Sequence, residues 1–181
     1  SNEGQAYIKE MNYCTEFANR SRRKMMKTVM NVMGELFSGI MFGEIIESVH
    51  NYAAIENHYG ENVWVHRKGA TLARKGTVGI IPGSQGTFSY IVEGLGNPES
   101  FMSCSHGAGR KMSRTKAIAE LDLQEEIKKM DGIVHGIRNQ KDLDEAAGSY
   151  KDIKSVMEQQ KNLVKVLVEL KPLGVDRKSV V

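Results

Sequence analysis

The chain has 181 residues, of which 40% are hydrophobic and 26% charged, so it can bury a core and remain soluble. Its net charge of +3 is too small to indicate a nucleic-acid partner, but positive residues cluster in 20–27, 67–75 and 110–116. No apolar run reaches the roughly 18 residues of a membrane-spanning helix and no signal peptide is recognisable, so we expect no membrane partner. Cys14 and Cys104 have neither a disulfide framework nor zinc-site spacing, which favours a reducing, cytoplasmic location.

Residues 1–60 are predicted to be helical. Apolar or small residues recur in steps of three and four from about residue 4 to residue 37, which predicts one long amphipathic helix. The positions that form this stripe are Met11, Cys14, Ala18, Ser21, Met25, Val29, Val32 and Leu36. A helix of this length suggests packing against more protein than the chain contains. A second helix is expected from about residue 42 to residue 58.

The rest of the chain is predicted to mix strands and helices. Residues 61–110 are expected to be β-rich, with glycines at turns or bulges and strands at 62–66, 77–81 and 88–92. Residues 111–181 are expected to hold a helix over 113–130 capped by Ser113 or Thr115, a strand at 133–137, a helix at 150–160, and a strand or short helix at 163–170. The predicted fold class is α+β, with long amphipathic helices packed on a glycine-rich mixed β-sheet.

The most informative stretch is 101–114, where His106 precedes three small residues and several cations. Gly107, Ala108 and Gly109 carry so little side-chain bulk that their N–H groups can approach a phosphate closely. Cationic side chains such as Arg110 can supply charge to the same anion. A histidine at the head of such a segment is suited to attack phosphorus or to shuttle a proton.

Three other interpretations of this stretch exist. A P-loop is excluded, because Lys111 is followed by Met112 instead of Ser or Thr and is separated from the glycine by Arg110. Cys104 is a candidate nucleophile with His106 as its base, although no third partner is apparent. An ordinary histidine beside a glycine-rich turn is the remaining alternative.

The other candidate features are weaker. On one helix His50 and His58 would be roughly 12 Å apart, too far to bind one metal ion together. His50 alone is more typical of a capping or core histidine than of a ligand. The loop 82–89 is either a plain hairpin turn or a nucleotide-contacting loop, in which backbone amides and Ser89 meet a base or phosphate. The basic turn 66–70 suits a phosphate but is common on surfaces.

Taken together, these segments resemble the RtcB family of RNA-splicing ligases. The runs that carry the resemblance are 50–53 (HNYA), 63–70 (VWVHRKGA), 81–84 (IPGS), 89–92 (SYIV) and 103–110 (SCSHGAGR), in the family's order and with similar spacing. The resemblance implies an RtcB-like fold and an enzyme that joins an RNA 3′-phosphate or 2′,3′-cyclic phosphate to a 5′-hydroxyl with GTP and manganese. It also implies that the chain is the carboxy-terminal portion of such a ligase domain.

The resemblance also implies roles for individual residues. His106 is expected to become guanylylated, and His50 to be a manganese ligand. The GMP site is expected to be lined by His50, Asn51, Pro82, Gly83, Ser84, Gln85, Ser89, His106, Gly107, Ala108 and Gly109. Family members usually end in Lys-Gly at the guanine, so Lys178 is the expected counterpart, and Gln85 stands where methionine is common. By charge and position alone, Lys68, Arg110 and Arg114 are candidates to hold RNA or terminal phosphates.

Family members are longer than this chain, and their amino-terminal half carries the remaining metal ligands. We therefore expect an incomplete fold, a missing half as partner, exposed apolar surface with self-association, and little or no activity of the chain alone. Two alternatives stay open: a non-catalytic RNA- or nucleotide-binding module derived from the ligase, and a small hydrolase using Cys104 and His106.

Overall fold

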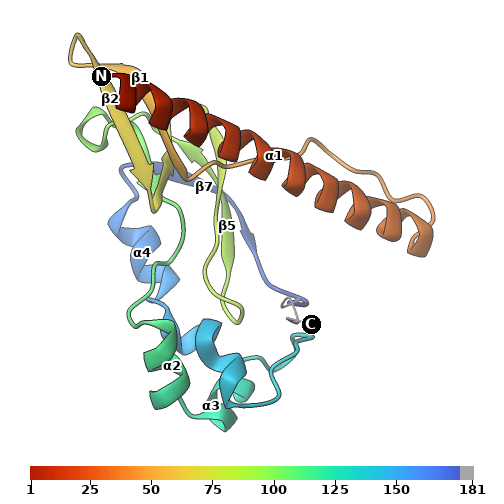
Figure 1. Ribbon diagram of the computed structural model, residues 1–181. Coiled ribbons are helices and arrows are strands. Elements are labelled where there is room, and N and C mark those ends of the chain that lie inside the picture. Colours follow the sequence, from red (N-terminus) through yellow and green to blue (C-terminus); the bar gives the residue numbers. More distant parts are fainter. Residues whose placement is uncertain (176–181) are drawn as a thin grey trace. The chain divides into compact units, whose positions relative to one another are not determined.

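The computed structural model describes residues 1–175, which divide into a first compact unit of residues 1–68 and a second that begins at Gly69 (Figure 1). Within residues 1–175 no helix is both long and apolar enough to cross a membrane.

The first unit opens with one long helix, α1 (Asn2–Leu36), which confirms the helix predicted over 4–37. Its side chains reach the rest of the unit at Met11, whose Sδ lies 3.1 Å from the backbone nitrogen of Ala53, and at Arg23, which pairs with Glu47 at 2.7 Å. No residue of α1 is buried, and the carboxy-terminal part of the apolar stripe, including Met25, Val29 and Val32, is exposed. The amphipathic pattern is therefore present, but most of the apolar face lacks a covering layer within this unit.

The helix expected over 42–58 is wrong, because residues 51–58 form a strand. β1 (Asn51–His58) pairs with β2 (Glu61–Lys68) in an antiparallel hairpin, and residues 40–50 have no regular structure. The two-residue turn is Tyr59-Gly60, with φ of 55° and 86°, and this pair of positive values suits the right-handed twist of the strands. Cross-strand pairing over eight residues overrode a local helical pattern.

An ionic cluster on one side of this hairpin is buried. Arg67 and Glu56 are only 2% and 6% exposed, and Nη2 of Arg67 donates to Oε2 of Glu56 at 2.9 Å. Arg67 also donates to the hydroxyl of Tyr52, and His58 contacts the Glu56 carboxylate. Burial acts to lower the pKa of Arg67, but the hydrogen bond and charge of Glu56 outweigh it and raise the pKa overall. The cluster holds the two strands in register.

The strands of the second unit form two small antiparallel sheets. β4 (Val78–Ile81), β5 (Ser89–Gly94) and β7 (Val164–Leu170) form one, and β3 (Ala70–Leu72) and β6 (Ser103–Ser105) form the other. The strands predicted near 62–66, 77–81, 88–92 and 163–170 are confirmed. The single mixed sheet is wrong: across the two units the named strands make three separate sheets with antiparallel pairing throughout.

The helices of this unit are short. They are α2 (Arg114–Glu120), α3 (Leu123–Lys128), α4 (Ile153–Gln159) and the 3-10 turns Pro98–Ser100, Gln140–Glu145 and Ala147–Ser149. Ser113 caps α2 by accepting from Lys116 N, which confirms one of the two predicted caps. The helix expected over 113–130 is two helices, because Asp122 accepts from Glu125 N and starts a new one.

Two apolar clusters stabilise the second unit. The first joins the three-stranded sheet to α4 and includes Ile81, Tyr90, Val92, Cys104, Ala108, Ile153, Met157 and Val164. The second gathers Met130, Ile133, Ile137, Leu143 and Ala146. The strand expected over 133–137 is wrong, since this segment contributes Ile133 and Ile137 to that second cluster and makes one isolated bridge through Val134.

Candidate nucleotide site

His106 follows β6 directly and lies beside the start of β3. The antiparallel pairing places Ser105 opposite Ala70, so His106 comes next to Gly69. Its Nδ1 lies 2.8 Å from the Gly69 carbonyl oxygen. A carbonyl oxygen only accepts hydrogen bonds, so Nδ1 carries the proton of the neutral imidazole and Nε2 carries the lone pair. The ring is therefore held in one tautomer, with a nucleophilic nitrogen at the far side from Gly69.

The small residues after His106 allow two backbone segments to approach each other. Ala108 N donates to the carbonyl oxygen of Pro82 at 3.0 Å. A Cβ on Gly107 would lie 3.1 Å from the same oxygen, which is tighter than ordinary contact. The N–H of Gly107 donates to Ser105 Oγ, whereas that of Gly109 has no acceptor within residues 1–175. Of the three amides predicted for phosphate contact, that of Ala108 thus joins the His106 segment to the loop 82–89, and that of Gly107 bonds within the segment itself.

The loop 82–89 is held by hydrogen bonds between its own residues. The N–H of Ser84 donates to Thr87 Oγ1 at 2.7 Å, and the two hydroxyl oxygens are 2.9 Å apart. A Cβ on Gly83 would overlap the carbonyl oxygen of Phe88 and Thr87 Oγ1, so only glycine fits. Gln85 lies in this loop and Ser89 opens β5. Of the predicted GMP-lining residues in 82–89, the structure places Pro82 directly beside Gly107 and Ala108.

Arg110 is held in a network around Glu145. Its guanidinium donates to Glu145 Oε2 at 2.9 Å and to the Asp144 carbonyl oxygen at 2.6 Å, and lies over the Tyr150 ring. Arg114 donates to the other oxygen of Glu145 at 2.7 Å, although its side chain is largely exposed. This geometry gives Arg110 a structural task and leaves Arg114 the more accessible of the two candidate phosphate-binding cations.

The protonation of this network follows from the same contacts. Burial acts to raise the pKa of Glu145, but hydrogen bonds from Tyr150 and Arg114 and the charge of Arg110 bring it below its ordinary value. Burial, together with the hydrogen bond to Glu145, raises the pKa of Tyr150. The carboxylate is therefore ionised and the phenol neutral near pH 7.

His50, Asn51 and Lys68 belong to the first unit. His50 and Asn51 line a small cavity of about 210 Å³ between α1 and the segment before β1, which Cys14 and Arg22 also line. Lys68 is exposed at the end of β2. Lys178, the predicted guanine contact, lies outside the described residues.

The described residues do not make up a manganese site. Among residues 1–175, no group of three or more His, Cys, Asp or Glu side chains converges as metal ligands would. His50 alone cannot hold a manganese ion with useful affinity.

Cys104 does not face a substrate together with His106. It is 4% exposed and packs in the first apolar cluster with Tyr90 and Val92. A buried apolar environment suppresses thiolate formation and blocks access to the sulfur. The geometry therefore disfavours the hydrolase interpretation.

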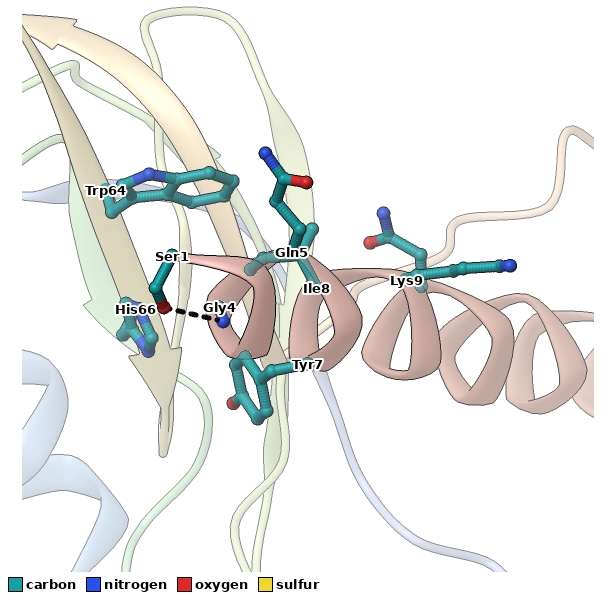
Figure 2. A pocket seen from close by; sticks show the side chains of 9 residues that line it. Ser1, Gly4, Gln5, Tyr7, Ile8, Lys9, Trp64 and His66 are labelled. Carbon is teal, nitrogen blue, oxygen red and sulfur yellow. Dashed lines mark hydrogen bonds between the residues drawn. The ribbon is translucent and has the colours of Figure 1, made fainter.

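Sequence reasoning missed a larger cavity in the first unit. It measures about 820 Å³ and lies between the first turns of α1 and one face of β2 (Figure 2). Trp64 and His66, two residues apart, face it from the strand, and Tyr7 lies parallel to the His66 ring within 6°. The signal that could have found it is the alternation Trp64-Val65-His66, which puts two aromatic rings on one face of a strand.

Comparisons with known proteins decide the family. The model of the family described as tRNA-splicing ligase RtcB matches residues 1–178. This chain belongs to the RtcB family. It is 42% identical over 171 residues to the RNA-splicing ligase RtcB of Escherichia coli strain K12, covering 91% of this chain and 42% of that relative. It is 34% identical to the tRNA-splicing ligase RtcB of Pyrobaculum aerophilum, covering 93% and 41%, and 32% identical to the RNA-splicing ligase RtcB of Mycobacterium tuberculosis, covering 96% and 45%. This RtcB chain therefore spans less than half the length of these curated relatives.

Proposed function

We propose that this RtcB chain carries the nucleophile of an RNA ligase that joins an RNA 3′-phosphate or 2′,3′-cyclic phosphate end to a 5′-hydroxyl end, with GTP as cosubstrate. The observation that carries the proposal is the hydrogen bond from His106 Nδ1 to the Gly69 carbonyl oxygen, which leaves the Nε2 lone pair for attack. Loop 82–89, joined to the segment after His106, supports a nucleotide at that nitrogen.

The first chemical step is attack of Nε2 on the α-phosphorus of GTP. A phosphorus–nitrogen bond forms, the bond to the bridging oxygen breaks, and pyrophosphate leaves with the electron pair. The proton stays on Nδ1, and its hydrogen bond to the Gly69 carbonyl oxygen stabilises the positive charge that develops on the ring. An oxygen of the RNA 3′-phosphate then attacks the same phosphorus, the phosphorus–nitrogen bond breaks, and GMP is carried by the RNA end. The 5′-hydroxyl attacks the RNA phosphate, and GMP leaves.

The full activity requires a complementary polypeptide that supplies the rest of the RtcB architecture. The chain spans 42% of its Escherichia coli relative, and the second half of α1 exposes Met25, Val29, Val32 and Leu36. An apolar stripe of this kind on a soluble protein marks a surface for another chain segment. The same polypeptide would supply the manganese ligands that residues 1–175 lack. We therefore expect the isolated chain to be nearly inactive and prone to self-association.

The test incubates the chain with manganese and GTP labelled on its α-phosphate, with and without the complementary part of the Escherichia coli relative. Acid-labile label on His106 that needs the complement supports the proposal. The matched controls are His106→Asn, which should lose all label, and His135→Asn, which should keep it. Label retained in the His106→Asn variant overturns the assignment.

The second candidate is a non-catalytic nucleotide- or RNA-binding module. One observation favours it: the described residues hold no metal-ligand cluster. Binding of GTP or RNA without any covalent adduct, even with the complement present, would support this candidate over the ligase.

A further inference from the structure

The 820 Å³ cavity of the first unit lies wholly within residues 1–68 and has no part in the site around His106. Its volume falls in the range of small-molecule and nucleotide sites, roughly 300–1,000 Å³. The lining includes the aromatic residues Tyr7, Trp64 and His66 and the polar residues Gln5, Lys9 and Asn12. Aromatic faces with a few hydrogen-bonding groups are the usual lining of a site for a flat heterocycle.

The aromatic side chains that line the cavity are not buried in an apolar core. Trp64 is 50% exposed and Tyr7 is 54% exposed, although each could bury far more surface in an apolar core. Trp64 pairs across the hairpin with Ile55, which is also exposed, so this face of the strands lies open. Figure 2 shows the indole of Trp64 beside the first turn of α1, with His66 further along the same strand.

The polar side chains of the cavity are likewise available for a ligand. Among residues 1–175, the side chains of Gln5, Lys9 and Asn12 have no hydrogen-bond or ion-pair partner. Amides of Gln and Asn can meet the donor and acceptor edge of a base, and the ammonium of Lys9 can meet a phosphate next to it. No carboxylate lines the cavity, so nothing in its wall repels an anionic backbone.

We propose that this cavity binds an unpaired base of single-stranded RNA, stacked on Trp64 and recognised at its edge by Gln5 or Asn12, with Lys9 on the flanking phosphate. This inference rests on the proposed RNA-ligase function, and it assigns a second RNA contact to residues of the first unit that are not part of the His106 site. Beside the ring of Tyr7 and the apolar Ile8, the cavity presents side-chain amides and the ammonium of Lys9. Ring faces together with a cation are the combination that binds single-stranded nucleic acid.

Trp64 is the only tryptophan of the chain, so its fluorescence reports on this cavity directly. The intact chain is titrated with single-stranded RNA hexamers bearing a 5′-hydroxyl, and the same oligomers carrying a dye give the affinity by anisotropy. We expect saturable quenching of Trp64, with the same midpoint as the anisotropy. Trp64→Ala should weaken binding about 5- to 150-fold, the range measured for losing one stacked base.

Matched variants and ligands decide the outcome. Tyr7→Ala should weaken RNA binding, whereas Tyr13→Ala, also exposed on α1 but outside the cavity, should not. Trp64→Phe should retain most affinity because a ring face remains. Quenching by GMP at lower concentrations than by RNA would overturn the proposal, as would RNA binding that leaves Trp64 unchanged. A Trp64 response to the complementary polypeptide but not to RNA would also overturn it and make this a protein interface.

The two proposals fail independently. His106→Asn abolishes guanylylation and should leave the quenching by RNA unchanged. A normal histidine adduct without any response of Trp64 would remove the second RNA contact and leave the ligase proposal intact.

Discussion

The carbonyl oxygen of Gly69 lies 2.8 Å from Nδ1 of His106 and so places the imidazole proton on Nδ1 and the lone pair on Nε2. The contact joins the residue before β3 to the residue after β6, and it depends on the pairing of these two three-residue strands. The acceptor is a main-chain oxygen, so a change of side chain elsewhere does not remove it. We therefore expect the hydrogen bond to His106 to be insensitive to most mutations except those that shift the strand ends.

Gly83 is expected to be irreplaceable in the loop beside His106. In Gly83→Ala the new Cβ would collide with the Phe88 carbonyl oxygen and Thr87 Oγ1, and we expect a loss of about 1–3 kcal/mol of unfolding free energy. Gly79→Ala is the control, because a Cβ there meets nothing within 4 Å. Urea unfolding followed by circular dichroism compares the two, and equal stability of both variants would contradict the prediction.

Glu145 is expected to stabilise the second unit in a pH-dependent way. Glu145→Gln removes the negative charge and one of the two oxygens that accept from Arg110 and Arg114, which should cost about 1–3 kcal/mol at pH 7. The folded-state pKa of Glu145 lies below its ordinary value, so its contribution is full above the unfolded pKa and is lost as the pH falls through the folded one.

The difference in unfolding free energy between wild type and Glu145→Gln should thus narrow below about pH 4, which is near the ordinary pKa of glutamate. Glu158→Gln, which breaks only the exposed pair with Lys161, is the matched control and should leave stability unchanged. Thermal unfolding from pH 3 to pH 7 provides the measurement. A gap that is constant over this range would rule out the carboxylate charge as the cause.

The buried pair of Glu56 and Arg67 is expected to dominate the stability of the hairpin. Glu56→Gln leaves a buried guanidinium without its counter-charge, and we expect a loss of about 3–5 kcal/mol. Glu61→Gln, exposed beside the hairpin turn, should be neutral. Replacing both Glu56 and Arg67 by methionine should cost less than the single change. A double variant that is less stable than Glu56→Gln would show that the pair itself, and not the orphaned charge, holds the strands.

The exposed stripe of α1 is expected to bind the complementary RtcB segment without contributing to the stability of this chain. Val29→Asp places a charge on a residue that is 56% exposed, so its melting temperature should change little. Binding to the complementary part of the Escherichia coli relative should weaken at least tenfold, by analogy with a charge buried in an interface. Asn31→Asp, also exposed on α1, is the control. Calorimetric titration measures both, and equal affinities would exclude this face.

The local sequence was sufficient to predict an element where its stabilising contacts lie within the same segment. The steps of three and four in α1, the cap at Ser113 and the alternating strand β5 were predictable because each depends on neighbours a few residues away. The helix expected over 42–58 failed because the partner of β1 is β2, and only pairing through the Tyr59-Gly60 turn reveals it.

The sequence by itself determined that His106 leads a segment of small and basic residues and that this pattern resembles RtcB ligases. Tertiary structure decided what these residues do in the fold: the smallness of Gly107 serves the approach of the Pro82 carbonyl oxygen, and Arg110 is held by Glu145, 35 residues further along. The physical reason is that residue type limits which contacts are possible, whereas the choice among them depends on atoms that only folding brings within hydrogen-bond distance. The tautomer of His106 is set by such a contact.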